Sequence, residues 1–419
     1  MKVRLPYGDS FLEVDLPDRN TNLLTGKHAP GLKDERKSIL SALRTPICSA
    51  ALRERVKKNH RIAVITTDNT RACPDDRILP VILEELEAIV PGENITIIVA
   101  LGLHAPLTHD ELEKKLGKDI VASYKVLNHN PALTTCIGET SRGTPVEVFT
   151  PVLASDFRIS TGFIEPHFFA GFSGGCKSIA PGVSSARSIR ANHSYRMLEH
   201  PAARAGVLAG NPVHEDMLEQ AGKAGLDFIV NVLLNEDGGI THVFAGDMKA
   251  AHEAGCRKAR ENNLVRLDRP ADITLTSNSG APLDMDFYQT VKGIDMAARI
   301  TRPGGIIIAA AACRIGLGPE AFCALHAQAG SPGEVLETIR SSAPAGVCWQ
   351  NQLLARAQIE HDVFLVSELD DAAVTSMMVT PAASVKAALE KAFLALGGDS
   401  RLFVVPGGPL LLPVLKTGA

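Results

Sequence analysis

Residues 61–67 read RIAVITT, and residues 95–102 read ITIIVALG. Each run has the length and the β-branched composition of a buried strand rather than of a helix. The residues between them, 75–89, have the apolar spacing of an amphipathic helix, with Pro80 near its beginning. Strand, helix and strand in this order predict a parallel β-α-β unit, which is the building block of α/β proteins.

The same alternation continues along the chain. Residues 108–111 read THDE, the pattern of a capping box, and Gly117 is placed to end the helix that follows. Further strands are expected at 157–165 and 227–235. Around residues 263–272 the pattern restarts, and a second series of strands and helices begins with DITLTSN at 272–278.

We therefore expect two α/β domains with mainly parallel sheets, an N-terminal domain over 1–266 and a C-terminal domain over 267–419. In such proteins the active site usually lies in the cleft between domains, at the carboxyl ends of strands. The last apolar run, LFVVPGGPLLLPV at 402–414, contains prolines that end a helix rather than continue it. This run is also compatible with a return to the first domain.

Composition and charge exclude several classes of protein. The net charge is −4 and aromatic residues make up 5%, which argues against nucleic-acid binding and against attraction to an anionic membrane. No run approaches the roughly 18 apolar residues of a membrane span, and the first residues lack the apolar centre of a secretion signal. Eight cysteines without a CxxC motif fit reduced thiols in the cytoplasm.

Polar segments follow the first two expected strands. In Asp68-Asn69-Thr70-Arg71, the Asp68 carboxylate can accept hydrogen bonds from sugar hydroxyls, and Arg71 can hold a carboxylate or phosphate. Taken alone, this segment fits better a turn that caps the next helix, with Arg71 on the surface. His104 follows the second strand and can act as a general base near neutral pH, although a lone histidine is more often structural.

Residues 162–178 read GFIEPHFFAGFSGGCKS. The amides of so many glycines can cradle a phosphate, with Lys177 as the counter-charge. The segment is not a Walker A motif, because Cys176 stands where that motif needs glycine. A glycine turn with a purely structural role would not explain why Glu165 and His167 cluster with Lys177 in one segment.

Two further segments carry candidate residues. His193 and His200 are separated by six residues, which fits no standard zinc motif, so a metal here would need ligands from outside a compact protein cluster. In the second half, a helix expected at 286–300 places Tyr288, Gln289 and Lys292 close together. A phenol, an amide and an ammonium can receive a carboxylate, while a solvated helix face is the ordinary alternative.

The order of these segments is more specific than any one of them. D-x-T-R, G-x-H, E-P-H-x-x-A-G-F-S-G-G-x-K-S, N-H and Y-Q-T-V-K-G follow one another from LPYG at 5–8 to WQNQL at 349–353. This order and spacing resembles the nickel-dependent lactate racemase family across nearly the whole chain.

The resemblance implies a cofactor and roles for particular residues. The cofactor would be the nickel-pincer nucleotide, a pyridinium-3,5-bisthiocarboxylic acid mononucleotide that holds nickel through two sulfurs and a ring carbon, bound by the 1–266 domain. His193 would be the protein ligand of nickel, and Lys177 would carry or cradle the nucleotide, with a covalent link left open. The loop around the cofactor would be Asp68, Asn69, Thr70 and Arg71; the acid/base pair would be His104 and His167; and the substrate would be bound by Arg71, Tyr288, Gln289, Lys292 and Trp349.

The activity implied is that of an isomerase: a racemase or epimerase that inverts C2 of a 2-hydroxy acid, lactate or a related acid, by hydride transfer to and from the cofactor. The implied partners are the small 2-hydroxy acid and the proteins that synthesise the cofactor, and the oligomeric state stays open. Arg314 lies in a loop where the family more often has an acidic residue, which points to a different substrate pocket and to a second substrate carboxylate.

Two alternatives remain open from the residues. One is a protein that binds a nucleotide or phosphate on the glycine-rich segment without turnover. The presence of both His104 and His167 argues against it, because a protein that only binds needs neither. The other is a mononuclear metallohydrolase that uses His167, His193 and His200.

Overall fold

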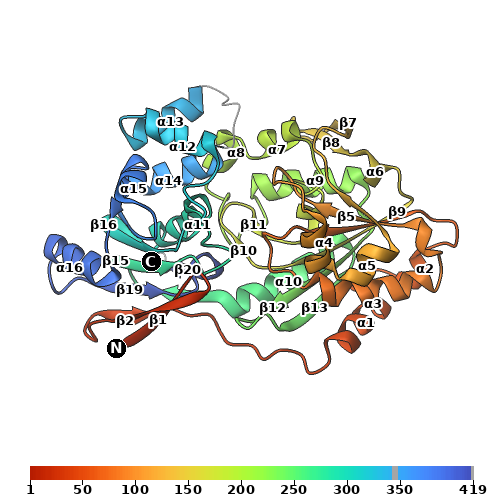
Figure 1. Ribbon diagram of the computed structural model, residues 1–419, viewed down its shortest axis with the longest axis horizontal. Coiled ribbons are helices and arrows are strands. Elements are labelled where there is room, and N and C mark those ends of the chain that lie inside the picture. Colours follow the sequence, from red (N-terminus) through yellow and green to blue (C-terminus); the bar gives the residue numbers. More distant parts are fainter. Residues whose placement is uncertain (342–347, 417–419) are drawn as a thin grey trace. The chain divides into compact units, whose positions relative to one another are not determined.

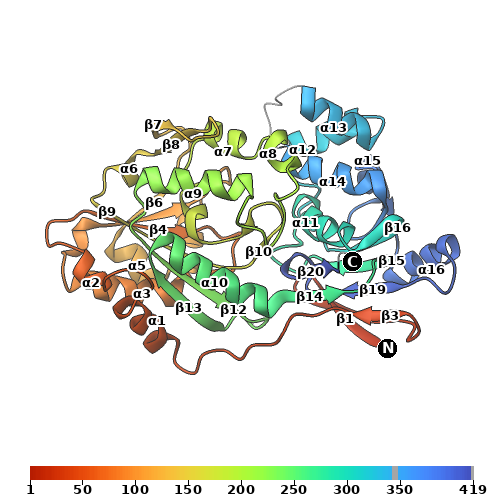
Figure 2. The same cartoon turned by 180° about the vertical axis from the view of Figure 1, so that it is seen from behind.

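The computed structural model describes residues 1–341 and 348–416. The chain divides into two units (Figures 1 and 2). The continuous segment His28–Asn262 forms one of them, which we call the central unit. The other, the split unit, joins Met1–Lys27 to Asn263–Ala419.

The central unit is built on a six-stranded sheet with the order β13-β12-β9-β4-β5-β6. All neighbouring pairs are parallel except β12 and β13, which are antiparallel at one edge. The strands are β4 Ile62–Thr67, β5 Ile95–Ala100, β6 Lys125–Asn128, β9 Phe157–Phe163, β12 Phe228–Leu234 and β13 Ile240–Gly246; shorter pairs are formed by β7 Thr134–Glu139 with β8 Pro145–Phe149 and by β10 Pro166–His167 with β11 Gly171–Phe172.

Helices connect these strands, as the β-α-β pattern predicts. Their bounds are α1 Glu35–Arg44, α2 Leu52–Arg55, α3 Asp75–Glu87, α4 His109–Leu116, α5 Lys118–Ser123, α6 Thr150–Leu153, α7 Ala186–Asn192, α8 Tyr195–Glu199, α9 Pro212–Ala224 and α10 Met248–Asn263. One sheet face packs its alternate residues, such as Val64 and Ile97, against α1 and α3, where Leu43 and Leu79 are fully buried. The capping box predicted for Thr108 and Glu111 is confirmed at the start of α4.

The split unit contains a second six-stranded sheet, β18-β17-β16-β15-β19-β3, in which every neighbouring pair is parallel. Its strands are β15 Ala271–Ser277, β16 Thr301–Ala310, β17 Asp362–Val366, β18 Thr380–Pro381, β19 Leu402–Val405 and β3 Thr21–Leu23, with the pairs β1 Lys2–Tyr7 and β2 Ser10–Asp15, and β14 Leu264–Leu267 and β20 Leu412–Leu415. Its helices are α11 Phe287–Ala298, α12 Glu320–Gln328, α13 Pro332–Ser341, α14 Trp349–Glu360, α15 Asp371–Ser376 and α16 Val385–Leu396.

The division differs from the expected 1–266 and 267–419 at the N-terminal end of the chain, and the C-terminal part begins at Asn263 rather than at residue 267. Met1–Lys27 belongs with the C-terminal part, because β3 extends the second sheet beside β19 and the β1–β2 hairpin supplies Leu5 and Val14 to its core. The C-terminal run does not return to the first domain either. Its strand β20 pairs with β14, which keeps it in the split unit.

Among the residues that the structure describes, no helix is both long and apolar enough to cross a membrane.

Candidate active site

Two loops leave the central sheet side by side at the carboxyl ends of β4 and β5. These strands are parallel and paired as far as Thr67 and Ala100, so the segments that follow them start from the same edge. The first segment carries Asp68 and the second carries His104. Asp68 Oδ2 lies 2.5 Å from His104 Nδ1, which joins residues 36 positions apart into one hydrogen-bonded pair.

The surroundings of Asp68 determine how this pair can work. Asp68 is 3% exposed and also accepts hydrogen bonds from the backbone N and the Oγ1 of Thr70, at 3.1 and 2.7 Å. Burial raises the pKa of Asp68. The hydrogen bond and charge of His104, together with Thr70 and Arg71, lower this pKa by more than burial raises it, so it lies below its ordinary value. An ionised carboxylate only accepts, so His104 Nδ1 donates and Nε2 is able to take a proton.

Helix α4 holds the loop that carries Asp68. Lys115 Nζ donates to the backbone oxygens of Arg71 and Cys73, at 3.1 and 2.9 Å, and lies 3.0 Å from Asp75 Oδ2. The Lys115 side chain is 9% exposed and Asp75 is fully buried, so all three ammonium protons have acceptors inside the protein. One turn earlier, Glu111 accepts a hydrogen bond from Asn69 Nδ2 at 3.1 Å. The sequence analysis did not identify Lys115 or Glu111 as site residues.

The glycine-rich segment follows β9, and two buried polar side chains hold it through hydrogen bonds to its backbone. Asn231 Oδ1 accepts a hydrogen bond from Gly175 N at 2.7 Å, and His252 Nε2 lies 2.8 Å from Ser173 O. Gly175 has φ +55°, and a Cβ there would lie 2.6 Å from Cγ of His252. Glycine is therefore required at this position for space as well as for conformation.

His167, Lys177 and His193 meet around Phe169. Lys177 Nζ lies 3.4 Å from His167 Nε2 and 5.9 Å from the centre of the Phe169 ring. The rings of His167 and His193 lie edge to face with Phe169, at centroid distances of 4.7 and 4.8 Å. The structure therefore brings together three of the residues that the sequence analysis selected.

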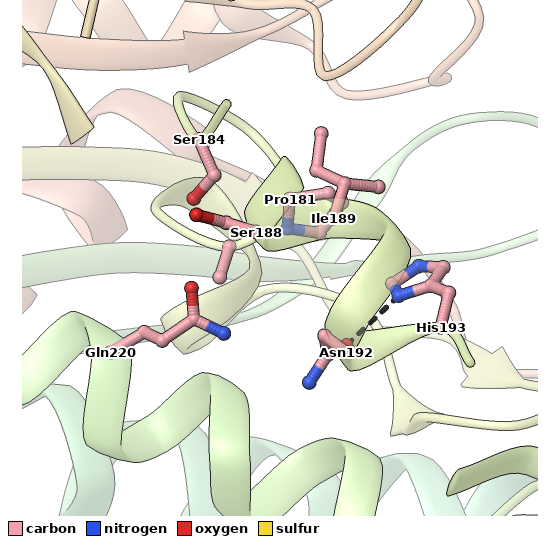
Figure 3. A pocket seen from close by; sticks show the side chains of 8 residues that line it. Pro181, Ser184, Ser188, Ile189, Asn192, His193 and Gln220 are labelled. Carbon is pink, nitrogen blue, oxygen red and sulfur yellow. Dashed lines mark hydrogen bonds between the residues drawn. The ribbon is translucent and has the colours of Figure 1, made fainter. Parts of the chain in front are cut away.

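His193 is 6% exposed and follows the last residue of α7, Asn192. Burial, together with the positive charge of Lys177, lowers the pKa of His193 to about 3. Its Nδ1 lies 2.9 Å from Asn192 Oδ1 (Figure 3). A neutral imidazole in this environment is the form that binds a metal.

The described residues allow only certain kinds of metal site. Within 1–341 and 348–416, no three His, Cys, Asp or Glu side chains are grouped so that they could hold a metal ion. This contradicts the alternative of a metallohydrolase with His167, His193 and His200. A single imidazole fits a metal whose other ligands come from a bound organic group, and imidazole suits Ni(II). Lys177 beside it fits an anionic group such as a phosphate or thiocarboxylate.

In the split unit, the four predicted substrate residues lie on α11 and at the start of α14. Asp286 caps α11 by accepting a hydrogen bond from Gln289 N at 2.6 Å, and Gln289 and Lys292 are half-buried neighbours on this helix. Tyr288 forms a hydrogen bond with Trp349, and burial raises the pKa of Tyr288 above its ordinary value.

Arg314 does not have the role that the sequence suggested for it. Its guanidinium pairs with Asp9, at 2.9 Å, and with Glu368, at 3.1 Å. Two carboxylates already neutralise it, so it is not placed as a receptor for a second substrate carboxylate.

Known proteins match this chain over both units. Residues 7–206 match the lactate racemase N-terminal domain, and residues 267–412 match the lactate racemase C-terminal domain. The lactate racemases of Thermoanaerobacterium thermosaccharolyticum and Lactiplantibacillus plantarum are each 36% identical to this chain, over 97% of its length and 97% and 98% of theirs. The chain belongs to the lactate racemase family.

The solved structure of a lactate racemase agrees with this membership of the family. The lactate racemase apoprotein from T. thermosaccharolyticum superposes with a TM-score of 0.92 at 36% identity, covering 99% of this chain and all of that one. A Thermotoga maritima protein shares the fold at 19% identity, with a TM-score of 0.68 over 91% of this chain and 98% of that one. The predicted fold class, α/β with mainly parallel sheets, is confirmed.

Proposed function

We propose that this chain is an isomerase that inverts C2 of a 2-hydroxy acid, with lactate as the first substrate to test. Its membership of the lactate racemase family supports this reaction. The observation that carries the proposal is the Asp68–His104 pair, because a carboxylate that orients an imidazole at a strand end is the arrangement of a general base.

We further propose that the chain works with the nickel-pincer nucleotide. His193 would be the nickel ligand, Lys177 would hold the nucleotide through its charge or a covalent bond, and the loop of Asp68, Asn69, Thr70 and Arg71 would border it. When bound, this group supplies an electrophilic carbon that takes up hydride and returns it. The buried, neutral imidazole of His193 supports this assignment, because a metal held by the nucleotide needs only one protein ligand.

The chain's own residues would manage protons and orientation. His104 would remove the hydroxyl proton of one enantiomer through Nε2, and His167 would serve the other, so that each face of a planar 2-keto acid has its own base. Each would contribute roughly 10²–10⁴-fold to the rate. Arg71, Tyr288, Gln289, Lys292 and Trp349 would bind the substrate, with the cationic groups receiving its carboxylate.

We also propose that the enzyme acts in the cytoplasm and receives its cofactor from dedicated biosynthesis proteins. All eight cysteines are free thiols, which suits a reducing compartment.

The test is expression together with a cofactor-synthesis system, followed by a nickel assay, mass spectrometry and chiral chromatography of L-lactate incubations. We expect about one nickel per chain, a nucleotide-sized mass adduct and formation of D-lactate. His104→Gln and His167→Gln should each lower kcat by roughly 10²–10⁴-fold while keeping nickel. A folded chain that never takes up nickel or the adduct, although the supply is competent, would contradict the proposal.

A further inference from the structure

The residues behind His193 form a hydrogen-bond chain that the reaction itself does not use. Asn192 is the last residue of α7, and Asp216 lies on α9. Both are 1% exposed. Figure 3 shows the bond between the Asn192 amide and the His193 ring beside a small cavity, with Gln220 on the neighbouring helix. Asn192, His193 and Gln220 are among the residues that line the cavity.

The partners of Asn192 fix which way its amide points. Asn192 Nδ2 donates to Asp216 Oδ2 at 2.7 Å and to the backbone oxygen of Val213 at 3.1 Å. Both partners only accept hydrogen bonds, so the amide nitrogen must face them and Oδ1 must face His193. Oδ1 in turn only accepts, so His193 Nδ1 carries the proton, and Nε2 is the nitrogen with the lone pair.

Asp216 is itself held in place. Thr140 Oγ1 donates to its Oδ1 at 2.5 Å, and Gln220 Nε2 donates to its Oδ2 at 2.9 Å. The carboxylate therefore receives neutral donors from Thr140, the residue after β7, from α7 and from its own helix. A rotation that released Asn192 would leave buried polar groups unpaired, which is unfavourable.

We propose that Asp216 and Asn192 are positioning residues, which select the Nδ1–H tautomer of His193 and so present Nε2 to nickel. This inference rests on the proposed role of His193 as the nickel ligand. Histidine ligands commonly donate their second ring N–H to such a partner, and the loss of the partner weakens metal binding by about 10–100-fold.

The first arm of the test uses the metal-free protein and does not depend on activity. Long-range ¹H–¹⁵N spectra of ¹⁵N-histidine-labelled protein report the tautomer, and His193→Gln assigns the signal. We expect Nδ1–H in the wild type. Asp216→Asn replaces the charged acceptor of Asn192 Nδ2 with a neutral amide, which weakens the hold on the Asn192 amide and should admit an Nε2–H population. Asn192→Ala removes the acceptor and should also mix the tautomers.

Glu219→Gln is the matched control, because it makes the same kind of change on α9 at a residue that pairs with Ser141 and Lys223 instead. It should keep the Nδ1–H tautomer. Two variants at different positions guard against the misfolding of either one, and thermal unfolding identifies a variant that does not fold. A wild-type Nε2–H tautomer, or an unchanged tautomer in both Asn192→Ala and Asp216→Asn, would overturn the inference.

The second arm measures nickel release from the cofactor-loaded enzyme into a colorimetric chelator. We expect release roughly 10–100-fold faster in Asn192→Ala and Asp216→Asn than in the wild type or Glu219→Gln. Nickel retention by His193→Ala would instead contradict the ligand role and the inference with it. The expected tautomers in the first arm would then show that the hydrogen-bond chain is real and that the proposed function is what failed.

Discussion

Asp68 is the residue whose role changes most between sequence and structure. The sequence presents it as a partner for cofactor hydroxyls, whereas in the structure its Oδ2 is bonded to His104 and its Oδ1 to Thr70. A sequence motif lists residue types in order, but it does not say which loops meet. Here the meeting follows from the parallel register of β4 and β5, which places both loops at one sheet edge.

The lowered pKa of Asp68 predicts a pH dependence of stability. In the unfolded chain its pKa is about 3.9, and in the folded protein it is lower. Asp68 therefore contributes stability that is fully present above about pH 4 and lost as the pH falls toward the folded pKa. We expect the difference in unfolding free energy between wild type and Asp68→Asn to shrink between pH 6 and pH 3.

Urea unfolding at pH 6, 4 and 3 measures this difference. Asp76→Asn is the control, because Asp76 is exposed at the start of α3, the helix that follows the loop of Asp68. Its difference should not follow that pattern. A difference for Asp68→Asn that grows as the pH falls would mean that the folded pKa is raised instead.

Helix α4 shows what an element contributes beyond its own residues. Its charged pattern resembles a solvated helix, but Lys115 is buried against Asp75 and holds two backbone oxygens of the neighbouring loop. The sequence therefore predicted this helix and its capping box. It did not predict that Lys115 would hold the neighbouring loop, because the burial of the Lys115 side chain depends on packing. The hydrogen bond between Asn192 and Asp216 also depends on packing. The adjacent Asn192 and His193 are visible in the sequence, whereas Asp216 lies 24 residues away from Asn192.

Lys115→Met should leave the buried Asp75 carboxylate without its cation. Breaking a buried pair in this way costs about 3–5 kcal/mol of unfolding free energy. Lys114→Met, at the exposed neighbouring position, should change it by less than about 0.5 kcal/mol. Chemical denaturation compares the two variants, and equal free energies of unfolding would show that the Lys115–Asp75 pair does not stabilise the protein.

The glycine-rich segment should tolerate no side chain at Gly175. Gly175→Ala forces a side chain into a left-handed backbone position and against His252, and it should destabilise the protein by about 1–3 kcal/mol. Gly222→Ala is the matched control, because Gly222 lies in α9 with nothing within 4 Å of an added Cβ. That change should stabilise by about 0.4–1 kcal/mol. A neutral Gly175→Ala in thermal unfolding would argue against a rigid segment.

The whole molecule was predictable as two α/β units, but its connectivity was not. Alternating strands and helices indicate parallel sheets, and the restart near residue 263 marks a boundary. Nothing local in the first 27 residues says which sheet a short hairpin and a three-residue strand will join. That choice is made by the edge of β19 and by the core that Leu5 and Val14 complete.

This division predicts how fragments behave. The segment 28–262 contains a complete sheet and core, so we expect it to unfold cooperatively when expressed alone. The segment 263–419 lacks β1, β2 and β3, and we expect it to bind hydrophobic dyes and to unfold without a sharp transition. Circular dichroism with thermal melts distinguishes the two, and a cooperative 263–419 would show that the N-terminal strands are dispensable.

The proposed function depends on one reaction, the inversion of lactate without loss of its C2 hydrogen to solvent. The most direct measurement incubates L-lactate with the nickel-loaded enzyme in D₂O and analyses both enantiomers by chiral separation and mass spectrometry. Hydride transfer predicts D-lactate that keeps protium at C2, because hydride leaves and returns without exchange. Deuterium at C2, or no D-lactate from a chain shown to carry nickel and the nucleotide, would contradict it.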